Sequence, residues 1–143
     1  GKFSMKFDGT HYRSIWFDEK VNIVSLIHPK STISKFSSLG LGTCVMANAV
    51  INPGTLIKDG VIINTSASID HDCKLEDHVH IGPGATLCGG VTIGRGSFIG
   101  AGSVIIEGVS IGDNVVVGAG TTVHKNVGSG LKIIGASFRL VGD

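Results

Sequence analysis

The chain has 143 residues, of which 42% are hydrophobic and only 16% charged, and its formal net charge is +1. This length fits one domain with a short appendage, and the balanced charge argues against a nucleic-acid-binding protein or a disordered acidic chain. No apolar run approaches the about 20 residues of a membrane-spanning helix, and the N-terminus lacks the apolar core of a secretory signal. We therefore expect a soluble, cytoplasmic protein without a nucleic-acid or membrane partner.

The first 20 residues alternate apolar and polar side chains around Asp8-Gly9, a dipeptide typical of a hairpin turn. They predict a β-hairpin, and a lead-in strand follows it, so residues 1–26 form an N-terminal unit. We expect this hairpin to act as a cap that protects the first coil of the following repeat from edge-to-edge pairing.

From Ile27 to Val123 the sequence repeats every six residues without a slip. Every sixth residue is Ile, Leu or Val in 17 of 17 hexads, where the composition predicts about five. The fifth place is small or β-branched, and the fourth is Gly or Asn in 12 of 17 hexads, residues that accept left-handed backbone angles readily. Each hexad therefore predicts a short strand and a tight corner, and such units must wind into stacked coils to share a core.

This pattern resembles the hexapeptide-repeat left-handed β-helix, in which three hexads make one triangular coil. The resemblance implies an all-β fold: a left-handed parallel β-helix of nearly six coils over residues 27–128, followed by a C-terminal tail over residues 129–143. Residues 18 apart would then lie one above the other, about 4.8 Å apart. Proteins with this repeat usually associate as trimers, so we expect a homotrimer.

One stretch breaks the pattern with chemically active side chains. Residues 69–80 hold three of the six histidines and four of the 11 acids of the chain. His71 and Asp72 occupy the third and fourth places of their hexad, which are corner positions. His80 stands between two inward-facing residues and is predicted to point outward.

A metal site is the first chemical interpretation of this stretch. The candidate ligands, as in a carbonic anhydrase built on the same type of helix, are His71, Asp72, His78 and His80. The residues one coil further on are Gly89, Gly96 and Phe98. Because none of these is a histidine, a metal site is disfavoured. The three cysteines of the chain also lack a Cys-x-x-Cys spacing.

General-base catalysis by His71 is the second interpretation. An unperturbed imidazole has a pKa of about 6.5, which suits proton removal at neutral pH, and the carboxylate of Asp72 could orient the ring. Gly89, one coil above, offers a backbone N–H for an oxyanion and leaves room for a substrate carbonyl. On spacing alone, a solvated polar corner is an equally good interpretation of His71 and Asp72.

The run INTSASIDHDCKLEDHVHIGPGATLCGGVTIG, residues 63–94, resembles the bacterial sugar acyltransferases that include sialic-acid O-acetyltransferases and bacillosamine and perosamine N-acetyltransferases. The resemblance, which spans about Val21 to Val127, implies that His71 is the catalytic base and that Asp72 raises its basicity. It also implies that His80 contacts acetyl-CoA.

The same resemblance extends to other positions of the helix. The glycine one coil above the base matches Gly89, and the backbone positions that contact the coenzyme fall on Ala101 and Ala119. It also places the adenine end of the coenzyme near the last coils, where three cations could meet the phosphates: Lys125, Lys132 and Arg139.

Two departures from the family's pattern stand out. Only 26 residues precede the first hexad, whereas the family has an N-terminal α/β domain that holds the nucleotide part of the sugar, so nucleotide binding is not carried over. The closing Gly-x-Pro-Ala motif is replaced by the sequence GASF at residues 135–138.

The sequence thus predicts a trimeric, acetyl-CoA-dependent acyltransferase that acts on an amino or hydroxyl group of a sugar, without a covalent enzyme intermediate. Two other functions remain open: a metal-dependent hydratase of the carbonic anhydrase type, and a non-catalytic trimeric scaffold.

Overall fold

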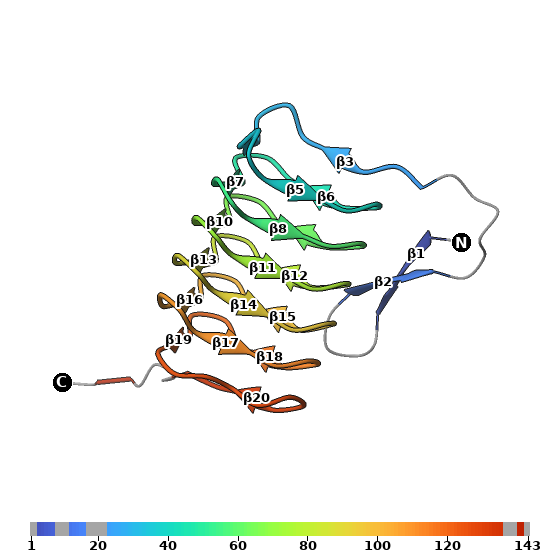
Figure 1. Ribbon diagram of the computed structural model, residues 1–143. Helices are drawn as coiled ribbons and strands as arrows, with labels where there is room; N and C mark the ends of the chain where they lie inside the picture. The colour runs from blue at the N-terminus through green and yellow to red at the C-terminus, as the bar shows by residue number, and fades with distance from the viewer. Residues whose placement is uncertain (1–2, 8–11, 17–22, 136–139, 142–143) are drawn as a thin grey trace.

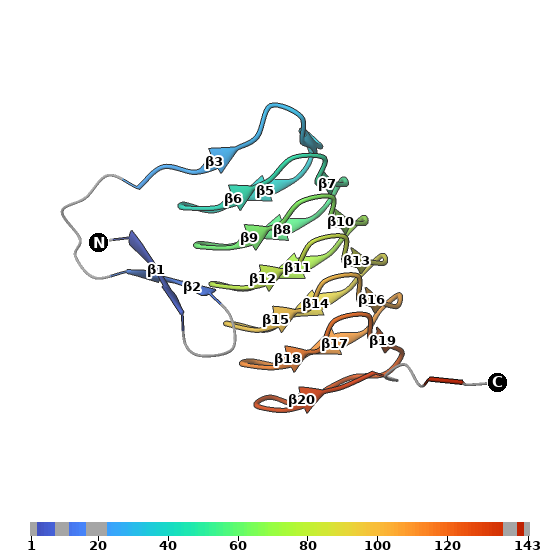
Figure 2. The same cartoon turned by 180° about the vertical axis from the view of Figure 1, so that it is seen from behind.

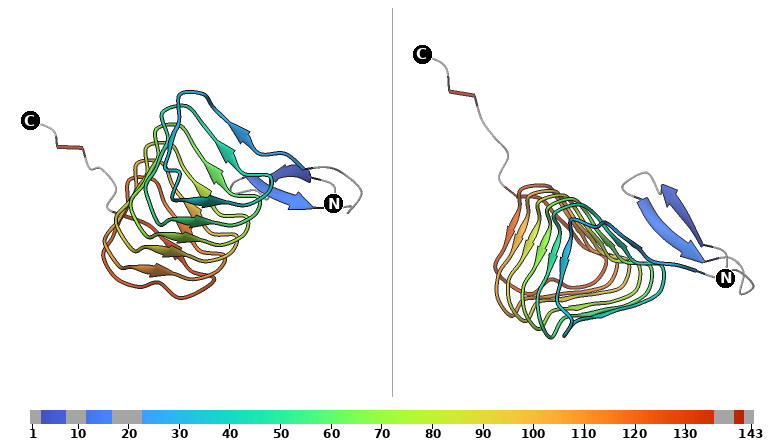
Figure 3. Two further views of the ribbon diagram at one scale, coloured as in Figure 1. Left: turned by 45° about the horizontal axis from the view of Figure 1, so that its top comes forward. Right: turned by 90° about the horizontal axis from the view of Figure 1, so that it is seen from above.

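The structure is a computed structural model, and it describes residues 3–7, 12–16, 23–135 and 140–141. Near the N-terminus, strands β1 (Phe3–Phe7) and β2 (Tyr12–Trp16) pair antiparallel. The predicted turn at Asp8-Gly9 lies outside the described residues. The hairpin lies outside the main body of the molecule, to one side of it (Figures 1 and 3). Its role as a cap stays a prediction.

The main body is a triangular prism with three parallel sheets as its sides (Figure 3). Sheet I contains β4 (Thr32–Ile33), β7 (Val50–Ile51), β10 (Ser68–Ile69), β13 (Thr86–Leu87), β16 (Val104–Ile105) and β19 (Thr122–Val123). Sheet II contains β5 (Ser38–Leu39), β8 (Leu56–Ile57), β11 (Lys74–Leu75), β14 (Thr92–Ile93) and β17 (Ser110–Ile111). Sheet III contains β3 (Leu26–Ile27), β6 (Cys44–Val45), β9 (Ile62–Ile63), β12 (His80–Ile81), β15 (Phe98–Ile99), β18 (Val116–Val117) and β20 (Lys132–Ile133).

The chain passes from sheet III to sheet I, then to sheet II and back to sheet III (Figure 2). We name the three edges of the prism by one residue each. The turns between sheets I and II form the Asp72 corner, those between sheets II and III the Asp59 corner, and those between sheets III and I the Ala101 corner.

The strand register confirms the predicted stacking of residues 18 apart. Ile69 pairs with Ile51 on one side and with Leu87 on the other. The fold is therefore the all-β, left-handed β-helix that the repeat predicts. The register changes only at β20, where Lys132 pairs with Val116. This last strand extends sheet III into residues 129–143.

The core follows directly from the repeat. The first residue of each central hexad is fully buried, as for Ile63 and Leu75 at 0% exposure, whereas Ile27 on the first coil is 49% exposed. Buried hydroxyls satisfy backbone carbonyls: Ser97 Oγ donates to the Gly112 carbonyl at 2.7 Å. This pairing removes the penalty of burying a polar group.

The corners require left-handed backbone angles at the fourth place of the hexad. Most of these places are glycine, but Asp72 has a φ of 56° and His78 a φ of 61°. A short polar side chain tolerates this conformation better than a bulky one does. Nowhere in the described part of the chain does a helix reach the length and apolarity needed to cross a membrane.

Candidate active site

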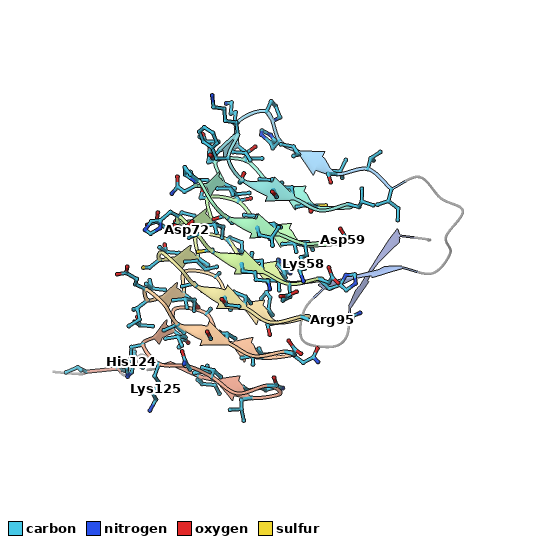
Figure 4. The ribbon with its side chains drawn as sticks, in the orientation of Figure 1. Lys58, Asp59, Asp72, Arg95, His124 and Lys125 are labelled. Carbon is cyan, nitrogen blue, oxygen red and sulfur yellow. The ribbon has the colours of Figure 1, made fainter. Side chains whose placement is uncertain are left out.

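His71 and Asp72 lie at the Asp72 corner, in the turn between β10 and β11. Figure 4 shows Asp72 on the edge of the prism, away from the edge that bears Asp59 and Arg95. Both side chains are accessible, with exposed fractions of 57% for His71 and 71% for Asp72. The repeat therefore supplies a rigid backbone, while the two side chains project outward from it.

The two side chains contact each other. His71 Nδ1 lies 3.0 Å from Asp72 Oδ2, a distance at which the ring N–H donates to the carboxylate. This hydrogen bond is the main reason why the pKa of His71 is raised above its ordinary value, and the charges of Asp70, Asp72 and Glu107 act in the same direction. With Nδ1 bound to Asp72, Nε2 is the nitrogen left to face a substrate.

Glycines on both neighbouring coils make room for this pair. A Cβ atom on Gly89 would lie 2.5 Å from His71 Nε2, and one on Gly54 would collide with the Asp72 carboxylate. The carbonyl of Gly89 accepts the Gly108 N–H at 2.9 Å. Among the described residues, no acceptor takes the Gly89 N–H. A hydrogen-bond donor thus stands directly beside the free nitrogen of the imidazole.

His80 lies elsewhere on the prism, on β12 of sheet III, the side opposite the Asp72 corner. Its Nε2 is 3.3 Å from the side-chain amide nitrogen of Asn64, and its ring meets that of Phe98 edge to face with centroids 5.0 Å apart. Asn64 was not predicted from the sequence as a partner of this histidine. Because the two are 16 residues apart, only the paired register of β9 and β12 reveals the contact.

The predicted coenzyme contacts are distributed over two edges and one side. Ala101 and Ala119 lie on the Ala101 corner, and neither backbone N–H finds an acceptor within the described segments. Lys125 lies on the Asp72 corner, two coils beyond Gly89, and Figure 4 shows it on the same side of the molecule as Asp72. Lys132 is in β20 of sheet III. Arg139 lies outside the described residues.

Within one chain, the structure thus brings together only part of the predicted site. His71, Asp72 and Gly89 form one cluster, whereas His80, Ala101 and Ala119 lie on sheet III and at its far edge. In the part of the chain that the structure describes, no three His, Cys, Asp or Glu side chains gather as a metal ion would require.

Two further residues contact the His71 turn without having been predicted. The carboxylate Oδ1 of Asp70 accepts the backbone N–H of His71 at 2.8 Å, and the side-chain amide of Asn52 donates to the same oxygen at 3.2 Å. Asn52 lies one coil before Asp70, so the spacing of 18 residues was the signal available in the sequence.

Comparison with known proteins places this geometry in context. The family model described as bacterial transferase hexapeptide (six repeats) matches residues 54–89 and 90–125. The acetyltransferase domain of PglB from Neisseria gonorrhoeae FA1090, solved in complex with acetyl coenzyme A, is 42% identical with a TM-score of 0.79. The match covers 81% of this chain and 57% of that one.

PerB from Caulobacter crescentus, solved in complex with CoA and GDP-perosamine, is also 42% identical with a TM-score of 0.79, over 79% of this chain and 55% of that one. WeeI from Acinetobacter baumannii AYE is 26% identical with a TM-score of 0.65, over 78% and 55% of the two chains. The chain thus spans little more than half the length of these relatives.

Proposed function

Because the chain belongs to the bacterial transferase hexapeptide family, we propose that it is an acetyl-CoA-dependent acyltransferase for an amino or hydroxyl group of a sugar. One observation carries the proposal: the free nitrogen of His71 stands over Gly89, whose N–H has no acceptor among the described residues. The ligands named for the similar PglB and PerB structures, acetyl coenzyme A in one and CoA with GDP-perosamine in the other, support the same donor and acceptor classes.

The mechanism follows from the placement of these groups. The acceptor nitrogen or oxygen attacks the thioester carbonyl carbon while His71 Nε2 removes its proton. The Gly89 N–H donates to the oxyanion that develops, and the Asp72 carboxylate stabilises the imidazolium. When the carbon–sulfur bond breaks, His71 returns the proton to the departing CoA sulfur. The acetyl group passes directly to the acceptor, so no covalent enzyme intermediate forms.

A homotrimer would complete this site. His71 lies on a convex edge, and the predicted coenzyme contacts at His80, Ala101 and Ala119 lie elsewhere on the same chain. If the sheet III side of a second copy faced the Asp72 corner of the first, the coenzyme would lie in the groove between them. This arrangement places the reaction in the cytoplasm, where acetyl-CoA is available.

Calorimetry with acetyl-CoA tests the donor, and a thiol-release screen tests the acceptor. We expect saturable binding of acetyl-CoA, weakened by His80→Ala, and release of free CoA thiol with GDP-perosamine or an amino sugar. Lys74→Gln, a change on the outer face of sheet II, is the matched binding control. Absence of binding at millimolar acetyl-CoA would refute the proposal and favour the non-catalytic scaffold.

A further inference from the structure

The carboxylate of Asp70 anchors the turn that bears His71. Its Oδ1 accepts two hydrogen bonds, from the His71 backbone N–H at 2.8 Å and from the Asn52 side-chain amide at 3.2 Å. The carbonyl of Asp70 accepts a third, from the Thr55 hydroxyl at 2.9 Å. Asp70 is therefore attached to the preceding coil through both its side chain and its backbone.

The sequence explains why Asn52 is available for this contact. At the equivalent place on the Ala101 corner, the Asn64 side chain accepts the N–H of the next residue, Thr65, at 2.7 Å. The residue after Asn52 is Pro53, which has no N–H to donate. The Asn52 side chain has no local donor to satisfy and reaches the next coil instead.

The following coil shows the opposite arrangement. Cys88 occupies the place that Asp70 has one coil earlier, and it offers no carboxylate to the N–H of Gly89. The corner thus has a fixed N–H at His71 and an available one at Gly89. Both states result from the residue type at the second place of the hexad.

We propose that Asp70 and Asn52 are positioning residues for the His71 base: Asp70 fixes the backbone of the His71 turn and adds a second negative charge beside the ring, and Asn52 holds Asp70 in place. This inference rests on the proposed role of His71 as the base. It does not depend on which sugar is the acceptor.

The electrostatic surroundings of His71 agree with this role. The acidic groups that act on it are Asp70, Asp72 and Glu107, and all three raise its pKa. The basic groups of the same corner are two coils away at Lys35 and three coils away at Lys125. The charge of Asp70 therefore adds to the effect of the Asp72 hydrogen bond.

Proton NMR titration of the imidazole, with its signal identified by loss in His71→Ala, tests the charge. Asp70→Asn preserves an oxygen acceptor and removes the charge, so we expect the pKa of His71 to fall while the turn stays intact. Asp59→Asn is the matched control, because Asp59 Oδ1 likewise accepts a backbone N–H, that of Leu41 at 2.8 Å, on another corner. An unchanged pKa in Asp70→Asn would overturn the electrostatic part.

Amide hydrogen exchange tests the positioning. Asp70→Ala removes the acceptor, and we expect the His71 amide to exchange about tenfold faster, whereas Asp70→Asn should retain its protection. Asn52→Ala should give a smaller increase. Unchanged exchange in Asp70→Ala would overturn the role of Asp70, and unchanged exchange in Asn52→Ala would remove Asn52 from the pair.

Turnover connects these two measurements to catalysis. With acetyl-CoA and GDP-perosamine as probe substrates, Asp70→Ala should lower kcat with little change in the KM for acetyl-CoA, and Asp70→Asn should restore part of kcat. Equal losses in Asp70→Asn and Asp70→Ala would contradict positioning. If wild type shows no turnover, the proposed function fails with these substrates, while the two NMR measurements still decide the positioning role.

Discussion

The environment of one imidazole decides the chemistry of the corner. His71 is exposed, yet its Nδ1 is held by Asp72 and its Nε2 stands over Gly89. An exposed histidine on a flexible loop would lack this fixed orientation. Because the turn is fixed to the coils on both sides, the protein needs no buried pocket to orient its candidate base.

Replacing His71 with alanine should stop catalysis without unfolding the protein. The side chain is exposed, so we expect an unchanged melting temperature, whereas loss of a general base typically lowers kcat by about 10² to 10⁴-fold. Steady-state kinetics and thermal unfolding measure the two effects. His28→Ala, at an exposed histidine of the first coil, should leave kcat unchanged. Near-normal turnover in His71→Ala would show that the base is another group.

Asp72→Asn should change the pH dependence more than the fold. Asparagine accepts the same positive φ, as Asn48 and Asn114 do, but it removes the charge that stabilises the imidazolium. The neutral imidazole is the active form, so activity is lost as the pH falls through the pKa of His71. Asp72 raises that pKa, and the variant should therefore have its acidic limb at lower pH, with a reduced kcat. An acidic limb that stays in place would separate Asp72 from the base.

Gly89→Ala should displace the His71 ring. The new Cβ would lie 2.5 Å from Nε2, and because the ring is exposed it can turn away at little expense to stability. We expect a large fall in kcat with a nearly unchanged melting temperature. Gly128→Ala is the control, since the nearest atom to its Cβ would be Leu131 Cδ1 at 3.9 Å. Full activity of Gly89→Ala would argue against an oxyanion site at this glycine.

At the scale of the element, strands and corners have separate tasks. The two-residue strands supply the buried aliphatic residues, and the four-residue turns supply every candidate catalytic group. Basic residues near the last coils, by contrast, do not form one group. Lys125 is on the Asp72 corner and Lys132 is on sheet III, so only an assembly of several copies could bring both to one coenzyme.

Replacing the three basic residues Lys125, Lys132 and Arg139 with glutamine should weaken coenzyme binding. CoA carries three phosphate groups, and loss of uniform binding raises KM while leaving kcat nearly unchanged. Kinetics with acetyl-CoA as the varied substrate, at low salt, measure this. Lys74→Gln is again the control, because Lys74 pairs with Glu76 on sheet II at 3.1 Å. A KM that does not move would show that these residues are only surface charges.

The repeat explains why so much of the fold could be predicted. A period of six residues fixes which side chains face inward, and the pairing of Ile69 with Ile51 and Leu87 follows from three hexads per coil. The contact of His71 with Asp72 was equally local and could be expected. Contacts between coils that depend on side-chain reach, such as Asn52 with Asp70, could not, because spacing gives proximity without direction.

At the scale of the whole molecule, the site is divided among different parts of the prism. The base lies at one edge, and the predicted coenzyme contacts at His80, Ala101 and Ala119 lie on another side and at another edge. A closed assembly with rotational symmetry would repeat the same junction at each interface. Each junction would then unite the edge of one copy with the side of the next.

Activity should therefore depend on association. We expect light scattering to give a trimer at assay concentrations, and specific activity to fall on dilution into the range where the trimer dissociates. Measuring mass and activity over the same dilution series makes the comparison direct. A stable monomer with full activity would refute a shared site.

The regular stacking of the coils also makes the Asp72 corner a ruler. His71, Gly89, Glu107 and Lys125 succeed one another at intervals of one coil, and three intervals of about 4.8 Å place Lys125 about 14 Å along the prism from the base. Removing residues 90–107 would preserve the strand register while bringing the lysine one interval nearer. The length of acyl donor that the protein accommodates would then be set by how many coils it has, and an 18-residue insertion or deletion would change that length in a single step.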